Sequence, residues 1–82
     1  MFNFNIPEDC FKVTVSTADA DSTLRVLFHL PGGIVDTLET RVNLEPTVIR
    51  TQINQLLTEA GFMESDYSVR QGQHVYTFER LL

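Results

Sequence analysis

The chain has 82 residues, of which 43% are hydrophobic, and this composition is typical of one globular domain and argues against intrinsic disorder. Eleven acidic and six basic residues give a formal net charge of −5, which disfavours a protein that holds nucleic acid mainly through its phosphates. No apolar run approaches the roughly 20 residues of a membrane helix, and the first residues do not resemble a signal peptide. We therefore expect a single compact domain over residues 1–82. Since Cys10 is the one cysteine, no internal disulfide can form, and we expect a reducing, cytoplasmic setting.

Residues 2–6 alternate apolar and polar side chains. This pattern fits either a short edge strand that ends at Pro7 or a terminus that tucks its phenylalanines onto the core. Residues 11–16 and 23–30 alternate more regularly and predict the two strands of a hairpin. In the expected register six apolar side chains share one face, as the pairs Val15–Leu24, Val13–Val26 and Phe11–Phe28.

The prolyl-diglycine sequence at residues 31–33 predicts a turn into a third strand at about residues 34–43. A three-residue loop sets apolar side chains opposite one another and brings Arg25 opposite Glu39, whereas a two-residue turn breaks the apolar match. We therefore predict the three-residue loop, with glycine in the left-handed conformation. This register leaves Asp36 on the apolar face, where it marks a candidate bulge.

Residues 46–60 predict an amphipathic helix, because apolar residues recur at i, i+4, i+7, i+8 and i+11 from Ile49 to Ala60. Pro46 suits the first helical turn, and Gly61 suits the left-handed position just past the end. The apolar stripe is expected to cover the sheet face formed by Phe11, Val13, Val15, Leu24, Val26, Phe28, Leu30, Ile34, Leu38 and Val42.

The dipeptide at residues 71–72 predicts a hairpin turn between strands at about residues 66–70 and 74–80. This turn pairs Val69 with His74 and Tyr67 with Tyr76. The sequence therefore predicts an α+β protein, with a single antiparallel sheet of four to six strands and one amphipathic helix packed on one face, in the order β-β-β-α-β-β. The place of the last hairpin in the sheet is left open.

Residues that carry catalysis or bind metal are sparse in this chain. Cys10, His29 and His74 lack the spacing of a zinc site or a catalytic pair, and no phosphate loop, nucleophile elbow or metalloprotease motif occurs. Residues 19–22 begin like a calcium loop, but the central glycine and the closing glutamate are missing. We therefore expect no enzymatic activity, no metal and no cofactor.

The C-terminal part of the chain offers one route to nucleic acid. An amphipathic helix that ends in the sequence of residues 60–62 and is followed by a glycine-centred hairpin resembles the last helix and wing of winged-helix domains, which implies DNA binding. The chain departs from that family because the helix carries one outward base, Arg50, and the hairpin carries Arg70 and Arg80. The first half also predicts strands where the family has two further helices. An RNA-binding sheet would need exposed aromatic residues, and the open face offers only His29.

The face of the sheet away from the helix carries a small apolar patch of Leu27, His29 and Val35, beside Arg25 and Glu39. Two interpretations remain open, namely ordinary surface hydrophobicity and a contact surface for a partner protein or a second copy. Acidic pairs in the predicted loops supply a second kind of contact. The candidate partner surface comprises Asp19, Asp21, Arg25, Leu27, His29, Val35, Glu39, Glu64 and Asp66.

The sequence is therefore expected to encode a small acidic protein-interaction module. In size, acidity and lack of catalytic residues it is similar to small phage-encoded inhibitors of bacterial defence systems, anti-CRISPR proteins among them, without a shared residue motif. That likeness implies a stoichiometric inhibitor in the host cytoplasm, whose carboxylates replace phosphates on a basic, nucleic-acid-binding partner. The alternatives are a self-associating structural or accessory subunit and the winged-helix-like DNA-binding protein.

Overall fold

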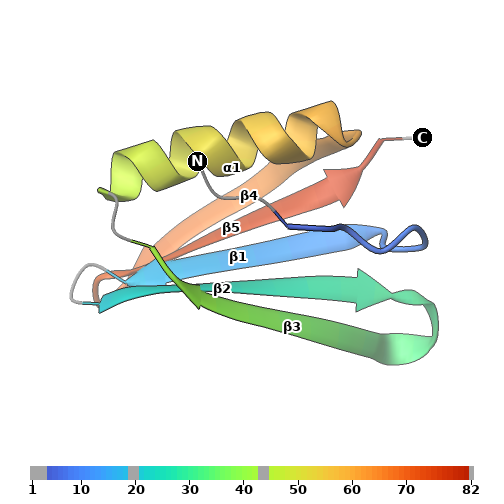
Figure 1. Ribbon diagram of the computed structural model, residues 1–82, viewed down its shortest axis with the longest axis horizontal. Helices are drawn as coiled ribbons and strands as arrows, with labels where there is room; N and C mark the ends of the chain where they lie inside the picture. Colours follow the sequence, from blue (N-terminus) through green and yellow to red (C-terminus); the bar gives the residue numbers. More distant parts are fainter. Residues whose placement is uncertain (1–3, 19–20, 43–44, 82) are drawn as a thin grey trace.

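The computed structural model describes residues 4–18, 21–42 and 45–81, and this part of the chain forms one antiparallel sheet with one α-helix packed on it (Figure 1). The predicted α+β class and the order β-β-β-α-β-β are confirmed. The elements are β1 (Lys12–Ala18), β2 (Asp21–Leu30), the 3₁₀ turn η1 (Pro31–Gly33), β3 (Ile34–Arg41), α1 (Pro46–Glu59), β4 (Phe62–Arg70) and β5 (Gln73–Arg80).

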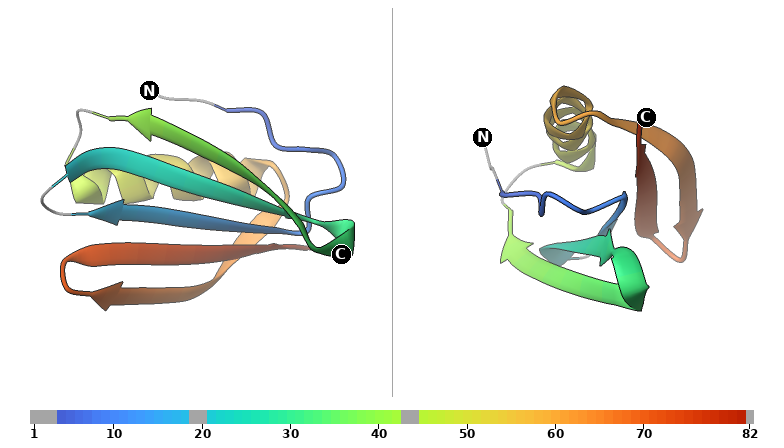
Figure 2. Two further views of the ribbon diagram at one scale, coloured as in Figure 1. Left: turned by 90° about the horizontal axis from the view of Figure 1, so that it is seen from below. Right: turned by 90° about the vertical axis from the view of Figure 1, so that its right-hand side faces the viewer.

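The five strands lie side by side in the order β3-β2-β1-β5-β4, and each neighbouring pair is antiparallel. The last hairpin therefore joins the sheet at β1, which becomes the central strand. Figure 2 shows that the sheet curves, with α1 and the N-terminal segment on the same side of it. The opposite side is open, and β3 and β4 form the two edges.

The first hairpin corrects the predicted register by two residues. The structure pairs Val13 with Phe28, Val15 with Val26 and Thr17 with Leu24, and the register shifts between Thr17 and Ala18. A shift of two residues keeps every side chain on its predicted face, because side chains alternate with period two. Phe11, however, now precedes β1 and is 51% exposed, so its predicted place in the core is wrong.

The other two hairpins have the predicted registers. Arg25 lies opposite Glu39 across the three-residue loop, and the β2–β3 register is continuous, so Asp36 marks no bulge. The turn of the last hairpin has two residues, Gln71 and Gly72, whose φ angles of 53° and 76° are positive, as a type I′ turn requires. The pairs Val69–His74 and Tyr67–Tyr76 are both present, and β4 starts at Phe62 instead of near residue 66.

The core lies between α1, the N-terminal segment and the concave side of the sheet. Ile49, Ile53 and Leu57 are buried as predicted, whereas Ala60 is exposed just past the helix. The strands, the N-terminal segment and the residues that flank them contribute Cys10, Val13, Val15, Leu24, Val26, Phe28, Val42, Phe62, Tyr76 and Phe78.

The N-terminal segment covers part of the core without forming a strand between residues 4 and 11; Phe2 lies outside the described residues. Phe4 and Ile6 pack against the core, and the ring centroids of Phe4 and Phe28 are 5.7 Å apart. Of β3, by contrast, only Leu38 is even partly buried, so the predicted core position of Ile34 is wrong. The reason is that α1 packs against the β4 side of the sheet and β3 lies away from it (Figure 1).

Candidate protein-binding surface

The open face of the sheet presents side chains in rows that cross all five strands. Since neighbouring strands lie about 4.8 Å apart, each row is about 19 Å long. The strand registers define three of these rows: Val35–His29–Lys12–Glu79–Met63, Thr37–Leu27–Thr14–Thr77–Asp66, and Glu39–Arg25–Ser16–Val75–Ser68.

The β2–β3 part of this face brings together five of the predicted site residues. His29 lies opposite Val35. Leu27, two residues before His29, is on the same face, and its side chain is half-buried. Beside them, Arg25 Nε donates a 2.7 Å hydrogen bond to Glu39 Oε1, so the opposite charges of this ion pair compensate each other. This part of the surface is therefore apolar with a compensated rim.

His29 contributes a neutral side chain to the patch. Its Nε2 lies 3.0 Å from Thr14 Oγ1 on the neighbouring strand. Burial, together with the positive charge of Lys12, lowers the pKa of His29 below its usual value of 6.5. The ring is therefore mostly uncharged near neutral pH. No three His, Cys, Asp or Glu side chains within the described residues are grouped so that they could hold a metal ion.

The predicted acidic residues do not form one surface. Glu64 lies opposite Phe78 on the helix side of the sheet, where its Oε2 is 3.3 Å from the Arg50 guanidinium. Asp66 lies opposite Thr77 on the open face, because a bulge between Glu64 and Asp66 separates the two. Asp19 is outside the described residues, and Asp21 is placed only as the first backbone position of β2.

One end of the sheet carries an apolar surface that the sequence pattern did not reveal. Phe11 N donates to His29 O, Arg80 N donates to Phe11 O, and Leu81 N donates to Gly61 O, so the start of β1 and the end of β5 meet there. The right-hand view of Figure 2 looks onto this end. Of eight exposed large hydrophobic residues in the described chain, the apolar end gathers five: Phe11, Ile34, Val35, Met63 and Leu81.

Sequence reasoning found only Val35 of the apolar end, because alternation assigned three other members to other places. Phe11 and Ile34 were expected in the core, and Met63 was expected before its strand began. Their common signal is position, since each stands at the first or second residue of a strand or just outside one. Only the order and direction of the strands place these positions at the same end of the sheet.

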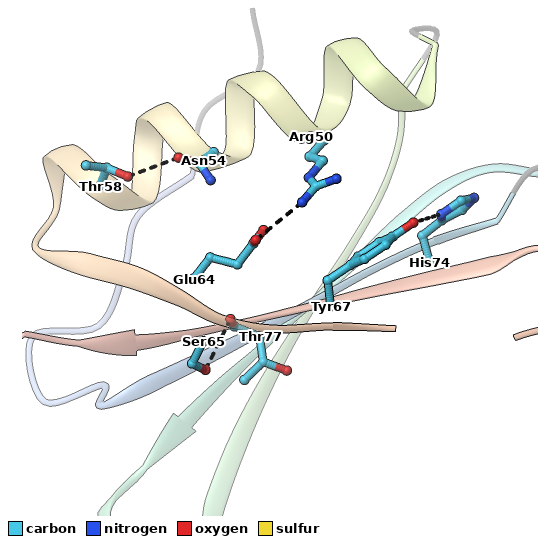
Figure 3. Close-up of polar contacts among 8 residues, drawn as sticks. All are labelled: Arg50, Asn54, Thr58, Glu64, Ser65, Tyr67, His74 and Thr77. Atoms are coloured by element: carbon cyan, nitrogen blue, oxygen red, sulfur yellow. Dashed lines mark hydrogen bonds and ion pairs between the residues drawn. The ribbon is translucent and has the colours of Figure 1, made fainter. Parts of the chain in front are cut away.

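A polar and aromatic cluster occupies the helix side of β4 and β5 (Figure 3). The Arg50 guanidinium carbon lies 4.7 Å from the centroid of the Tyr67 ring, which stacks on Tyr76 at 4.9 Å. The Tyr67 hydroxyl is 2.8 Å from His74 Nδ1. Arg50 also pairs with Glu64, so the base that was predicted to point outward from α1 is engaged with β4.

This arrangement departs from the winged-helix resemblance. Within the described residues there is one α-helix, and its Arg50 is engaged with β4. The last hairpin is not a projecting wing, since β5 pairs with β1 along its whole length. A shallow hollow beside the cluster is lined by Arg50, Thr51, Asn54 and Gln55.

None of the helices in the described residues combines the length and the apolarity that crossing a bilayer requires. Comparison with family models, with curated proteins and with solved structures finds no match. The chemistry of the surface is therefore what points to a function.

Proposed function

We propose that this protein is a non-enzymatic interaction module that binds another protein through the apolar end and the adjoining open face. The observation that carries this proposal is that Phe11, Ile34, Val35, Met63 and Leu81 are all exposed at the same end of the sheet, on or beside strands that run from one edge to the other. Single exposed apolar residues are ordinary, whereas gathered ones mark interaction sites.

The neighbouring side chains of the open face are mostly uncharged. The row behind the apolar end holds three threonines and the half-buried Leu27, with Asp66 at the β4 edge. Lys12 and Glu79 lie opposite each other in the first row, so their charges compensate. This charged pair stands in the middle of the first row, and the apolar Val35 and Met63 lie at its two ends.

The predicted stoichiometric inhibitor is one form of this proposal, in which the apolar end covers a surface that the partner needs for its own function. The net charge of −5 would speed encounter with a basic partner. Because Glu64 and Asp66 point to different faces, contact through the apolar end is better supported than mimicry of phosphates by clustered carboxylates. The free, buried Cys10 is consistent with the proposed reducing, cytoplasmic setting.

The test compares two aspartate substitutions on the same strand. Met63 is 58% exposed on the open face, and Val69 is 54% exposed on the helix side. Immobilised wild type, Met63→Asp and Val69→Asp are used to capture partners from a lysate of the encoding organism, and the captured protein is then titrated in purified form. Met63→Asp is expected to weaken binding by about 10- to 100-fold, because an unpaired carboxylate is buried, whereas Val69→Asp binds like wild type.

Equal affinity of the partner for wild type and Met63→Asp would refute the assignment of the binding surface. Retention of the wild type on heparin that declines with added salt would instead favour direct binding of nucleic acid. Circular dichroism of both variants verifies that each one is folded.

A further inference from the structure

We propose that β3 pairs edge to edge with β3 of a second copy, in antiparallel orientation, so that the two sheets join into one. β3 is an outer strand of eight residues, and its register with β2 has no irregularity. About half of its backbone N–H and C=O groups point away from β2, toward the open edge. A regular strand of this kind is a template for another strand.

The two edges of the sheet differ in protection. β4 contains a bulge between Glu64 and Asp66, and Arg50 of α1 contacts Glu64 and Tyr67 on it. Natural edge strands are protected by such bulges, by lysine or by proline. β3 has no bulge, lysine or proline, and only Leu38 among its side chains is partly buried. Each edge strand has one carboxylate on the helix-side face, Asp36 in β3 and Glu64 in β4, but only that of β4 contacts α1. β3 is therefore the edge that is open to pairing.

The register centred on Leu38 pairs residues 35–41 of β3 with a second copy, whereas one centred on Thr40 opposes Glu39 to Arg41 but pairs only residues 39–41 of the strand. A two-fold axis perpendicular to the sheet keeps the helices of both copies on the same side of the joined sheet. Open-face residues of one copy therefore oppose open-face residues of the other, and helix-side residues oppose helix-side residues. Centring the axis on Leu38 opposes the two Leu38 side chains. The remaining opposed pairs are then Thr37–Glu39, Asp36–Thr40 and Val35–Arg41, each with its second member from the other copy.

Neighbouring registers are less favourable. Centring on Asp36 or on Glu39 would oppose two carboxylates directly, which destabilises a strand pair. Centring on Thr37 sets the carboxylate of Asp36 against Leu38 of the second copy. The Leu38-centred register avoids both faults, and it lays the apolar stem of Arg41 along the exposed Val35. A second copy is thus the partner whose chemistry fits this edge.

The experiment is sedimentation equilibrium of the purified full chain, with Thr37→Lys and Thr37→Glu compared against wild type. Thr37 is exposed, so both variants should fold. In the Leu38-centred register each Thr37 faces Glu39 of the other copy. Thr37→Lys should therefore lower the dimer dissociation constant, and Thr37→Glu should raise it, each by a factor of about 2 to 30 from two symmetric pairs.

The direction of these effects identifies the register. With Thr37 on the axis both variants would weaken the dimer, and with Glu39 on the axis Thr37 would face Arg41 and the two effects would be reversed. Either pattern overturns the Leu38-centred register. A wild type and a Thr37→Lys variant that are both monomeric at millimolar concentration overturn the pairing itself. Ser68→Lys and Ser68→Glu, on the exposed face of the other edge strand, serve as controls and should change nothing.

The pairing strand β3 shares Ile34 and Val35 with the proposed partner site, but the substitutions that test the two proposals are on different strands. Met63 lies on β4, at the opposite edge from Thr37. Met63→Asp should leave the dimer dissociation constant unchanged, and Thr37→Lys should change it whether or not a partner is captured. The two proposals can therefore fail separately.

Discussion

Arg80 Nε donates a 2.8 Å hydrogen bond to the carbonyl oxygen of Cys10, across 70 positions of sequence. The same guanidinium reaches Glu8 O at 3.3 Å and lies 4.6 Å from the centroid of the Phe62 ring. Arg80 thus ties the N-terminal segment to the end of β5. Because Phe4 and Ile6 of that segment pack against the core, the contact also closes one side of the core.

Arg80→Ala should lower the free energy of unfolding by about 1–3 kcal/mol, because it removes charged hydrogen bonds to two backbone carbonyls. Amide exchange at Cys10, whose N–H is bonded to Pro7 O, should become faster. Denaturant unfolding and hydrogen exchange measure the two effects. Arg70→Ala, an exposed arginine at the other end of the sheet, is the control and should change stability by less than about 0.5 kcal/mol. Unchanged exchange at Cys10 in Arg80→Ala would contradict the tie.

Ile53 is 1% exposed in the middle of the buried stripe of α1. Ile53→Ala should cost about 2–5 kcal/mol, through the lost burial and the cavity that remains. Gln55→Ala, on the exposed side of the same helix, is expected to stay within about 0.5 kcal/mol of wild type. Urea unfolding gives both values, and similar midpoints for the two variants would mean that the helix does not pack through this stripe.

The protonation of His29 should couple folding to pH. Its pKa is lowered in the folded protein, first by burial and then by Lys12, so the unfolded chain binds more protons as the pH falls through the usual value of 6.5. The contribution of His29 to stability is therefore complete above pH 6.5 and declines as the pH falls toward the folded pKa. Denaturant unfolding between pH 5 and pH 8 should show a shallower pH dependence in His29→Gln than in wild type. Identical pH profiles for the two proteins would refute this coupling.

Gln71 holds a φ of 53° in the β4–β5 turn, a left-handed conformation that is costly for a side chain of its size. Gln71→Asn should raise the free energy of unfolding by about 0.5–1 kcal/mol, because asparagine tolerates this conformation better. Gly72→Ala, at a φ of 76°, should lower it by about 1 kcal/mol. The denaturation midpoints should move in opposite directions at a constant slope, and a shift of both in one direction would be inconsistent with the turn type.

The periodicity and the turn residues determine most of the local structure of this chain. The stripe from Ile49 to Leu57 defines the helix, and the glycines at residues 32 and 33 define a loop that brings Arg25 to Glu39. These features are predictable because they depend on residues close in sequence. Five residues of the candidate surface share the open face of the β2–β3 hairpin for the same reason.

Alternation cannot detect a shift of two residues, since both registers leave every side chain on the same face. The β1–β2 pairing and the exposure of Phe11 were decided by the irregularity after Thr17. A bulge likewise separates Glu64 from Asp66, although the two lie close in sequence. Such irregularities change the ladder without leaving a periodic signal.

The sequence alone determined the fold class, the one helix, two hairpin registers and the polar character of the open face. Only the tertiary structure decided that the last hairpin pairs with β1, that α1 leaves β3 uncovered, and that the apolar end forms. The physical reason is that these features depend on contacts between strands far apart in the chain. Periodicity reports which face a side chain takes, and long-range packing decides what that face meets.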